Sequence, residues 1–234
     1  MKNLPYESLH NHTKLSDGVL SHLEVLGVAE KAGFGVIAFT DHDALPSQET
    51  LSELEKYTGS VKWFIGCELS TSLPKELGGG ESSNFHIVGL FIDPFNKELL
   101  DHCSKMQKSR IERMERIVDN LSGLGFKITV EDCFTEAGDM NVSRPHIVRA
   151  LEKYKENKAV QAELINQMAK AAVGDKVVAE SYAKMIELGE QSYPYRLYLS
   201  SDAFIKDIFV DYTYSKDMDE IVDLIHGAGG VAIM

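Results

Sequence analysis

Residues 35–43 read Gly-Val-Ile-Ala-Phe-Thr-Asp-His-Asp, a short apolar run that ends in three polar residues. An apolar run of this length is typical of a buried β-strand. The pattern predicts an amphipathic helix on each side of it, over residues 20–31 and over residues 47–57. Buried strands that alternate with helices favour an α/β fold with parallel strands. The sequence around residue 40 therefore predicts the fold class.

The same alternation continues along the chain. Further strands are predicted over 61–66, 84–91, 126–130 and 231–234, and further helices over 97–122, 144–155, most of 158–190 and 217–225. We expect an α/β body made of residues 1–95 and 201–234, with residues 96–200 as a mainly helical insertion or lid. Because the sequence stops on the opening residues of an apolar strand, it is expected to be truncated at its C-terminus.

Composition and charge exclude several classes of protein. The chain has 234 residues, a net charge of −12 and a content of 44% hydrophobic residues, which is ordinary for a globular protein. The acidic charge argues against binding of duplex DNA, which requires many phosphates to be neutralised. No apolar run is long enough for a membrane span or a signal peptide. Three widely spaced cysteines predict no disulfide framework, so a cytoplasmic location is expected.

Histidines and carboxylates recur near the predicted strand ends. His10 and His12 are alternate residues, so on an extended segment both side chains project from one face. Asp17 follows them, and His42 lies one strand–helix unit later. Imidazole nitrogens together with carboxylate oxygens suit divalent transition metals. A lone His-x-His would more simply be a solvated strand end, but the second cluster favours a metal site.

Several of these motifs occur in the order that is found in one family. They are Ser-Leu-His-Asn-His at 8–12, Ser-Asp-Gly at 16–18, Thr-Asp-His-Asp at 40–43, Gly-Cys-Glu-Leu-Ser at 66–70, Phe-His-Ile-Val-Gly-Leu at 85–90 and Ser-Arg-Pro-His-Ile-Val-Arg-Ala-Leu at 143–151. The chain resembles the PHP (polymerase and histidinol phosphatase) superfamily, and within it the stand-alone phosphoesterases that act on nucleoside phosphates or short oligoribonucleotides. The resemblance implies a distorted (β/α)7 barrel and two to three divalent metal ions, which would be manganese, zinc or iron.

The resemblance also implies the residues of the site. The metal ligands carried over are His10, His12, Asp17, His42, Glu68, His86 and His146. The family's later His-Pro and Asp-x-His motifs would follow residue 234. The implied reaction is hydrolysis of a phosphate ester by a metal-bridging hydroxide, with Glu68 or Asp17 holding the metals together. The expected partner is a small phosphorylated substrate or a short RNA.

Arginine is the natural phosphate-binding residue because its guanidinium contacts two phosphate oxygens at once. Arg144, near the start of a predicted helix, is the first candidate for binding substrate, and Arg113 is the second. Arg113 shares a three-residue spacing with Arg110 and Arg116 that the resemblance supports. These three residues could instead line a solvated helix face, because glutamates interleave with them.

The other candidate residues have plainer interpretations as well. His86 could be a core histidine, Asp17 a turn residue and His146 a residue that contacts the end of its helix. Asp41 and Asp43 could cap a helix. The function also has alternatives, which are a phosphatase for a small metabolite such as histidinol phosphate and a non-catalytic metal-binding module. The sequence does not fix the oligomeric state.

Overall fold

The computed structural model describes residues 6–72, 85–138 and 141–234, which form two compact units. The first, the sheet unit, comprises residues 1–111, 137–143 and 212–234, and the second, the helical unit, comprises residues 112–136 and 144–211. Helix α3 (Lys97–Gly123) belongs to both. The lid role predicted for residues 96–200 stays a prediction.

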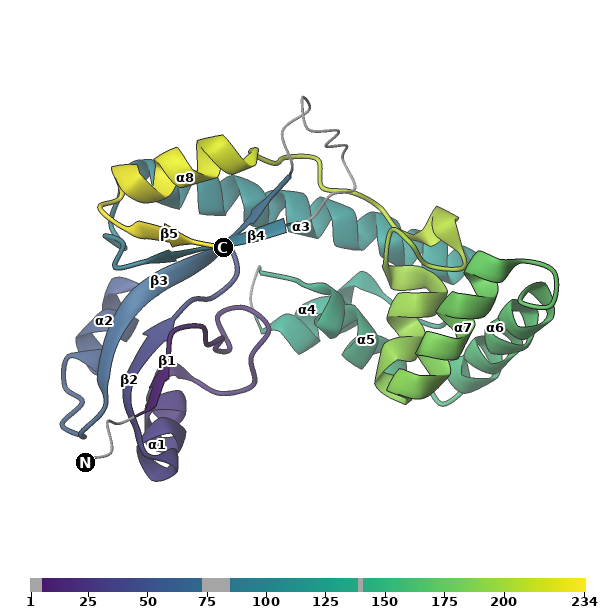
Figure 1. The fold of residues 1–234 in the computed structure, drawn as a ribbon, viewed down its shortest axis with the longest axis horizontal. Coiled ribbons are helices and arrows are strands. Elements are labelled where there is room, and N and C mark those ends of the chain that lie inside the picture. The colour runs from purple at the N-terminus through teal and green to yellow at the C-terminus, as the bar shows by residue number, and fades with distance from the viewer. Residues whose placement is uncertain (1–5, 73–84, 139–140) are drawn as a thin grey trace. The chain divides into compact units, whose positions relative to one another are not determined.

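The sheet unit is built on a curled five-stranded sheet in the order β1-β2-β3-β4-β5 (Figure 1). Its strands are β1 (Tyr6–Ser8), β2 (Phe34–Phe39), β3 (Lys62–Thr71), β4 (Phe85–Leu90) and β5 (Val231–Ile233). Strands β1, β2 and β3 are parallel, whereas β4 is antiparallel to both β3 and β5. The predicted α/β class is confirmed.

The helices of the sheet unit begin and end at residues that satisfy their free backbone groups. Helix α1 (His22–Ala32) starts with a capping box between Ser21 and Glu24 and stops at Gly33, whose φ is 83°. Helix α2 (Gln48–Leu54) is capped by Ser47, and α8 (Met218–Gly227) by Asp217. Helix α8 packs against β3, β4 and β5 (Figure 1).

The two faces of β3 have different roles because successive side chains of a strand point to opposite faces. Ile65, Cys67 and Leu69 are buried in one apolar core with residues of α1, α2 and α8. The residues that alternate with them, among them Glu68 and Ser70, therefore project from the other face. This alternation lets one strand stabilise the core and also carry a carboxylate for the candidate site.

The parallel arrangement that the strand–helix alternation favoured is wrong for β4. Ser70 of β3 pairs with His86 of β4, and Glu68 pairs with Val88, in antiparallel register. A parallel pair needs a long crossover connection, usually a helix, and residues 72–84 contain glycines and serines rather than an amphipathic pattern. Asn84, the first residue of the predicted strand, lies outside the described residues. Strand β3 also continues to Thr71, five residues beyond its predicted end.

The strand predicted over 126–130 is wrong as well, because helix α4 (Val130–Ala137) begins there. Thr129 and Asp132 exchange hydrogen bonds between side chain and backbone at the start of this helix. The backbone N–H and C=O of Lys127 bond to the side chain of Asn157 at 2.7 and 2.8 Å. The side chain of Asn157 thus satisfies backbone groups that a neighbouring strand would satisfy in a sheet.

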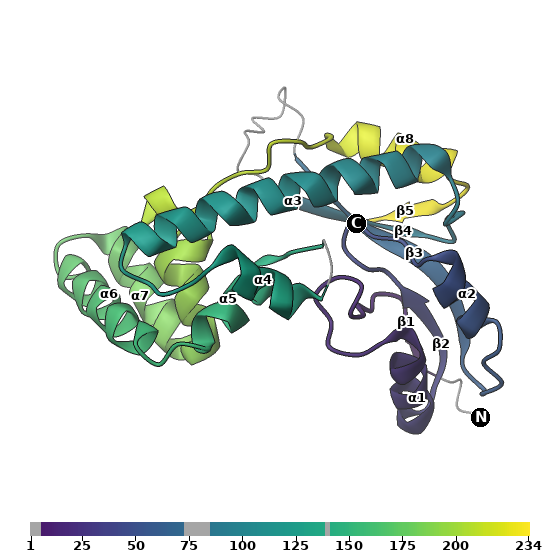
Figure 2. The same ribbon diagram turned by 180° about the vertical axis from the view of Figure 1, so that it is seen from behind.

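The helical unit is made of α4, α5 (Arg144–Glu152), α6 (Asn157–Ala171), α7 (Lys176–Leu188), the short turns η2 (Glu190–Ser192), η3 (Tyr195–Leu199) and η4 (Lys206–Ile208), and the second part of α3. Helices α6 and α7 pack against each other and against η3 (Figure 2). Within the described residues, none of the helices is both long and apolar enough to cross a membrane.

Replacing Gly66 with alanine is expected to destabilise the sheet unit. A Cβ at Gly66 would lie 2.5 Å from the carbonyl oxygen of Gly89, so β3 and β4 would have to move apart. We expect the free energy of unfolding to fall by about 1–3 kcal/mol. The measurement is urea denaturation. Gly27→Ala in α1 is the control, because its Cβ meets nothing within 4 Å and should stabilise the helix. Equal denaturation midpoints for the two variants would contradict the expectation.

Candidate metal centre

The segment that follows β1 carries His10 and His12. It lies outside the strand, and Asn11 fixes it to the end of β2. The side-chain amide of Asn11 donates to the carbonyl oxygens of Ser8 and Ala38 at 2.8 and 2.9 Å. The backbone N–H of Thr40 donates to the carbonyl oxygen of Asn11 at 2.9 Å. Asn11 thus holds both histidines beside the polar residues at the end of β2.

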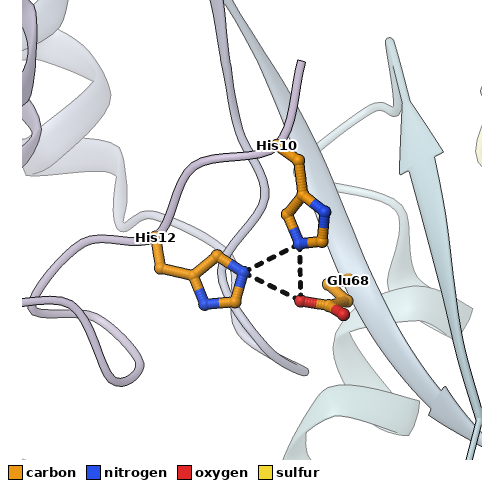
Figure 3. A group of neighbouring side chains, drawn as sticks. All are labelled: His10, His12 and Glu68. Atoms are coloured by element: carbon orange, nitrogen blue, oxygen red, sulfur yellow. Dashed lines mark hydrogen bonds and ion pairs between the residues drawn. The ribbon is translucent and has the colours of Figure 1, made fainter. Parts of the chain in front are cut away.

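His10, His12 and Glu68 point toward one another (Figure 3). The Nε2 atoms of the two histidines lie 2.9 Å apart, and each lies 2.8 Å from Oε2 of Glu68. Glu68 comes from β3, so residues 58 positions apart in sequence meet at one point. The predicted projection of both imidazoles to one side is therefore observed, although their segment is irregular.

Two further groups of donor atoms share residues with the first. His12, Asp17 and His42 form one group, and His42, Glu68 and His86 form the other. Nδ1 of His12 lies 2.7 Å from Asp17, and Nδ1 of His86 lies 3.3 Å from Oε1 of Glu68. The two oxygens of Glu68 thus face different histidines. Within each group the donor atoms all lie within 4.8 Å of one another.

The antiparallel direction of β4 explains the position of His86. His86 pairs with Ser70, two residues from Glu68, so the side chains of His86 and Glu68 lie on the same face of the sheet. The interpretation of His86 as a core histidine does not agree with this placement, because its ring faces Glu68 and is partly exposed. The N-terminal end of β4 thereby adds a side chain to the site.

The charges of the centre reflect its burial and its close contacts. Burial lowers the pKa of His12, but hydrogen bonds to Asp17 and Glu68 outweigh burial and raise this pKa to about 10. Burial and the positive charge of Arg110 lower the pKa of His42 to about 4. Burial raises the pKa of Glu68, but hydrogen bonds from His12 and His10 outweigh burial and lower it to about 2. At neutral pH Glu68 is ionised and His42 is neutral.

This set of donors fits divalent metal ions. Ligand atoms of a zinc-like ion lie about 2.0–2.2 Å from it, so donor atoms within 4.8 Å of one another, as in each group, need only small side-chain shifts to surround one ion. Nδ1 of His42 is buried and makes no hydrogen bond to any described residue, and it lies 3.4 Å from Glu68. A buried nitrogen without a hydrogen bond, beside an ionised carboxylate, is a suitable metal ligand. His12 is protonated at neutral pH, and a bound metal ion would take the place of this proton.

The three remaining predicted site residues lie in the helical unit. His146 is buried on α5. Arg144 donates to the carbonyl oxygen of Leu199 at 3.3 Å. Arg113 is buried, and its Nε donates to the carbonyl oxygen of Val210 at 2.6 Å. Their assignments as a metal ligand and as substrate-binding residues stay predictions.

The interpretation that the three arginines of α3 line a solvated helix face is wrong for two of them. Arg110 and Arg113 are both buried, and only Arg116 is exposed. Burial of a guanidinium requires hydrogen-bond partners, and Arg110 has them in Asp43 and Ser70. The three-residue spacing in the sequence did not reveal this, because a helical spacing does not say what covers that face.

Asp41 and Asp43 are not helix caps, since Ser47 caps the helix that follows them. The carboxylate of Asp41 accepts hydrogen bonds from the backbone N–H of Thr13 and the hydroxyl of Ser16, at 2.7 and 2.6 Å. It thereby fixes the turn that carries Asp17. Asn141 is a further residue that sequence reasoning missed, and its side chain donates to the carbonyl oxygen of His42 at 2.7 Å.

The PHP domain family matches residues 8–228, which is nearly the whole chain. The chain belongs to the PHP domain family. The family assignment made from the motifs is thus confirmed. Because the match runs from the histidine segment to the end of α8, it includes every residue of the three donor groups.

Curated relatives of this PHP protein act on RNA or nucleotides, as their names state. A 5′-3′ exoribonuclease of Haemophilus influenzae is 26% identical over 97% of this chain and 66% of its own length. A 3′,5′-nucleoside bisphosphate phosphatase of Chromobacterium violaceum is 28% identical over 61% of this chain and 48% of its own length. The chain thus spans about two thirds of the first relative, and its match covers about half of the second.

Solved structures share the fold of this PHP protein. A structure from Bifidobacterium adolescentis, assigned as a metal-dependent phosphoesterase, has a TM-score of 0.64 and 20% identity, and the match covers 98% of this chain and 67% of that one. A structure from Chromobacterium violaceum, described as an amidohydrolase with bound sulfate and no metal, also has a TM-score of 0.64, with 22% identity over 97% of this chain and 66% of that one. At this identity the likeness concerns the fold alone.

Proposed function

We propose that this chain carries the metal centre of a metal-dependent phosphoesterase that hydrolyses a nucleotide or a short oligoribonucleotide. The observation that carries the proposal is the position of Glu68, whose Oε2 faces His10 and His12 while its Oε1 faces His86. A carboxylate in that position can bind two cations at once and hold them against their mutual repulsion. The names of the two curated relatives support nucleotides or RNA as the substrate class.

The proposed ligands are the six residues of the three donor groups, with His146 as a seventh: His10, His12, Asp17, His42, Glu68, His86 and His146. We assign two to three divalent ions, of manganese, zinc or iron, to them. Such ions supply Lewis acidity, which activates water and neutralises phosphate oxygens. The finer fold that accompanies this proposal is the distorted (β/α)7 barrel, of which the sheet unit would form part.

The residues of the chain would prepare the site in distinct ways. Asp17 contacts Nδ1 of His12 and thereby orients the ring so that Nε2 faces Glu68. His42 needs no deprotonation at neutral pH because its pKa is low. Glu68 supplies negative charge without a change of protonation. The protonation states of His42 and Glu68 favour binding of cations, whereas His12 must release its proton when it binds one.

The direct test is elemental analysis of the purified chain together with an assay of phosphate release from adenosine 3′,5′-bisphosphate in manganese. We expect bound metal and turnover that a chelator abolishes and added Mn²⁺ restores. Release from the bisphosphate should exceed release from a small-metabolite ester such as histidinol phosphate. Bound metal without release from either ester would contradict the phosphoesterase activity and favour a non-catalytic metal-binding module.

Arg144→Ala tests the substrate side of the proposal. We expect KM for the phosphate ester to rise or kcat to fall by ~10-fold or more, because a charged hydrogen bond to phosphate is worth about 1.5–3 kcal/mol. Metal content should be unchanged. Arg149→Ala is the control on the same helix, since Arg149 pairs with Glu136 at 3.5 Å. Loss of metal in Arg144→Ala would mean that Arg144 has a structural role instead.

A further inference from the structure

A buried ion pair lies directly beside the donor groups, in the sheet unit. Asp43 follows His42 in sequence, and Arg110 reaches it from α3. Both side chains are buried, at 0% exposure for Asp43 and 5% for Arg110. A buried pair of this kind is weak evidence for stability, because desolvation of both charges offsets their attraction. Stability alone therefore does not explain why this ion pair lies next to the candidate ligand His42.

The side chain of Asp43 connects two segments that carry candidate ligands. Its carboxylate accepts hydrogen bonds from the backbone N–H and the hydroxyl of Ser70, at 2.9 and 2.7 Å. Ser70 is two residues beyond Glu68 on the same face of β3, while Asp43 is next to His42. The backbone N–H of Asp43 also donates to the carbonyl oxygen of Glu68 at 3.0 Å. The position of His42 relative to Glu68 is thus set through Asp43.

The backbone of Asp43 is also unusual. Its φ is 45°, in the left-handed region that few non-glycine residues adopt. The side-chain amide of Gln107 donates to the carbonyl oxygen of Asp43 at 3.2 Å, which holds this conformation from α3. Strained backbone persists where surrounding contacts over-determine it, and such positions cluster at functional sites. Asp43 is one of two described non-glycine residues with positive φ.

Arg110 keeps the carboxylate of Asp43 on Ser70. Its guanidinium donates to Asp43 and, at 2.9 Å, to the hydroxyl of Ser70, so both oxygens of Asp43 are occupied by protein donors. Asp43 is accordingly absent from the three groups of metal donors, although it adjoins His42. Without a neighbouring positive charge, a buried carboxylate this close to a cation site would itself attract the cation.

We propose that Asp43 is a positioning residue, held on Ser70 by Arg110, that fixes His42 relative to Glu68 and so sets the affinity of the centre for divalent metal. This inference rests on the proposed metal-binding function and goes beyond the ligands. Residues that orient metal ligands through hydrogen bonds typically change metal affinity by ~10- to 100-fold when they are lost. Asp43 touches neither metal nor substrate in this assignment.

Two double variants test the proposal at constant net charge. Asp43→Asn/Arg110→Met removes both charges but keeps an amide that can bond to Ser70, and asparagine tolerates positive φ. Asp43→Gly/Arg110→Met removes the same charges and also the bonds to Ser70, and glycine accepts this φ without strain. Because each pair loses one negative and one positive charge, electrostatic attraction of a cation changes equally in both. The two variants differ in the link from residue 43 to Ser70.

The measurement is the Kd for Mn²⁺ by titration calorimetry, with thermal unfolding of the metal-free proteins beside it. We expect the glycine double variant to bind Mn²⁺ ~10- to 100-fold more weakly than the wild type, and the asparagine double variant to bind nearly as well as the wild type. Ser109→Ala is the matched structural control. Its hydroxyl accepts from the backbone N–H groups of Thr213 and Tyr214 at 2.8 and 3.1 Å, next to Arg110 but away from the ligand segments.

Equal Mn²⁺ affinity in the two double variants would overturn the proposal, because a merely structural role lowers the unfolding temperature without separating their Kd values. If the glycine variant does not fold, Asp43→Ala/Arg110→Met takes its place, because it also removes both bonds to Ser70. Mn²⁺ binding equal to that of the asparagine double variant would then overturn the proposal equally. Absence of Mn²⁺ binding in the wild type would overturn the proposed function together with this inference. Wild-type binding without phosphate release would contradict the proposed activity alone, and the comparison of Kd values would stand.

Discussion

Glu68→Gln is expected to abolish phosphate release and to remove most of the bound metal. Glutamine keeps the shape of the side chain but replaces the charge, and its amide nitrogen cannot bind a cation. Both oxygens of Glu68 face histidines, so one substitution affects two of the three donor groups. Removal of a single electrostatic contact in an active site commonly costs ~10²–10³ in kcat, and we expect at least the upper end of that range.

Elemental analysis and the bisphosphate assay on Glu68→Gln give the result directly. Glu53→Gln on α2 is the matched control, because Glu53 is exposed and lies outside the donor groups. Circular dichroism of both metal-free proteins establishes that the fold is retained. Wild-type metal content in Glu68→Gln would contradict the bridging role of this carboxylate.

The double variant His10→Ala/His12→Ala is expected to lose metal and activity together. It removes both nitrogens of the first donor group and one member of the second. His10 is exposed and His12 is partly buried, so the change should leave the core of the sheet unit intact. We expect turnover to fall by ~10³-fold or more, as for loss of an essential electrostatic group.

The control for this variant is His226→Ala, since His226 is an exposed histidine at the end of α8. Metal content, turnover and thermal unfolding should match the wild type in the control. Full metal content and full activity in the double variant would refute the assignment of both histidines. Loss of activity with full metal content would move their role from metal binding to contact with substrate.

The parts of the fold that the sequence predicted are those in which local pattern and tertiary structure agree. The strand near residues 35–40 and the long helix near residues 97–122 are present, as β2 and α3. The direction of β4 could not be predicted in this way, because hydrophobic alternation does not encode whether a neighbouring strand is parallel. The apolar run at 126–130 is similar, since it gives no sign that the side chain of Asn157 satisfies the backbone of Lys127.

In the candidate site, the ligands could be predicted from the sequence, whereas the residues that position them could not. Six predicted ligands meet in three donor groups, and each carries a side chain whose chemistry alone suggests metal. The residues that position them were not identified, because Asn11, Asp41 and Asp43 act through hydrogen bonds to residues 27 or 28 positions away. A single sequence holds no signal for such contacts. Burial of Arg110 was likewise unpredictable, since its partners come from two other segments.

Because β3 and β4 pair in antiparallel register, that register determines whether the side chains of His86 and Glu68 lie close together. Ser70 stands opposite His86, and Ile87, the next residue of β4, belongs to the apolar core. If β4 slipped by one residue, its side chains would exchange faces, so that an imidazole entered the core and an isoleucine faced Glu68. A single deletion within β4 would therefore dismantle the centre.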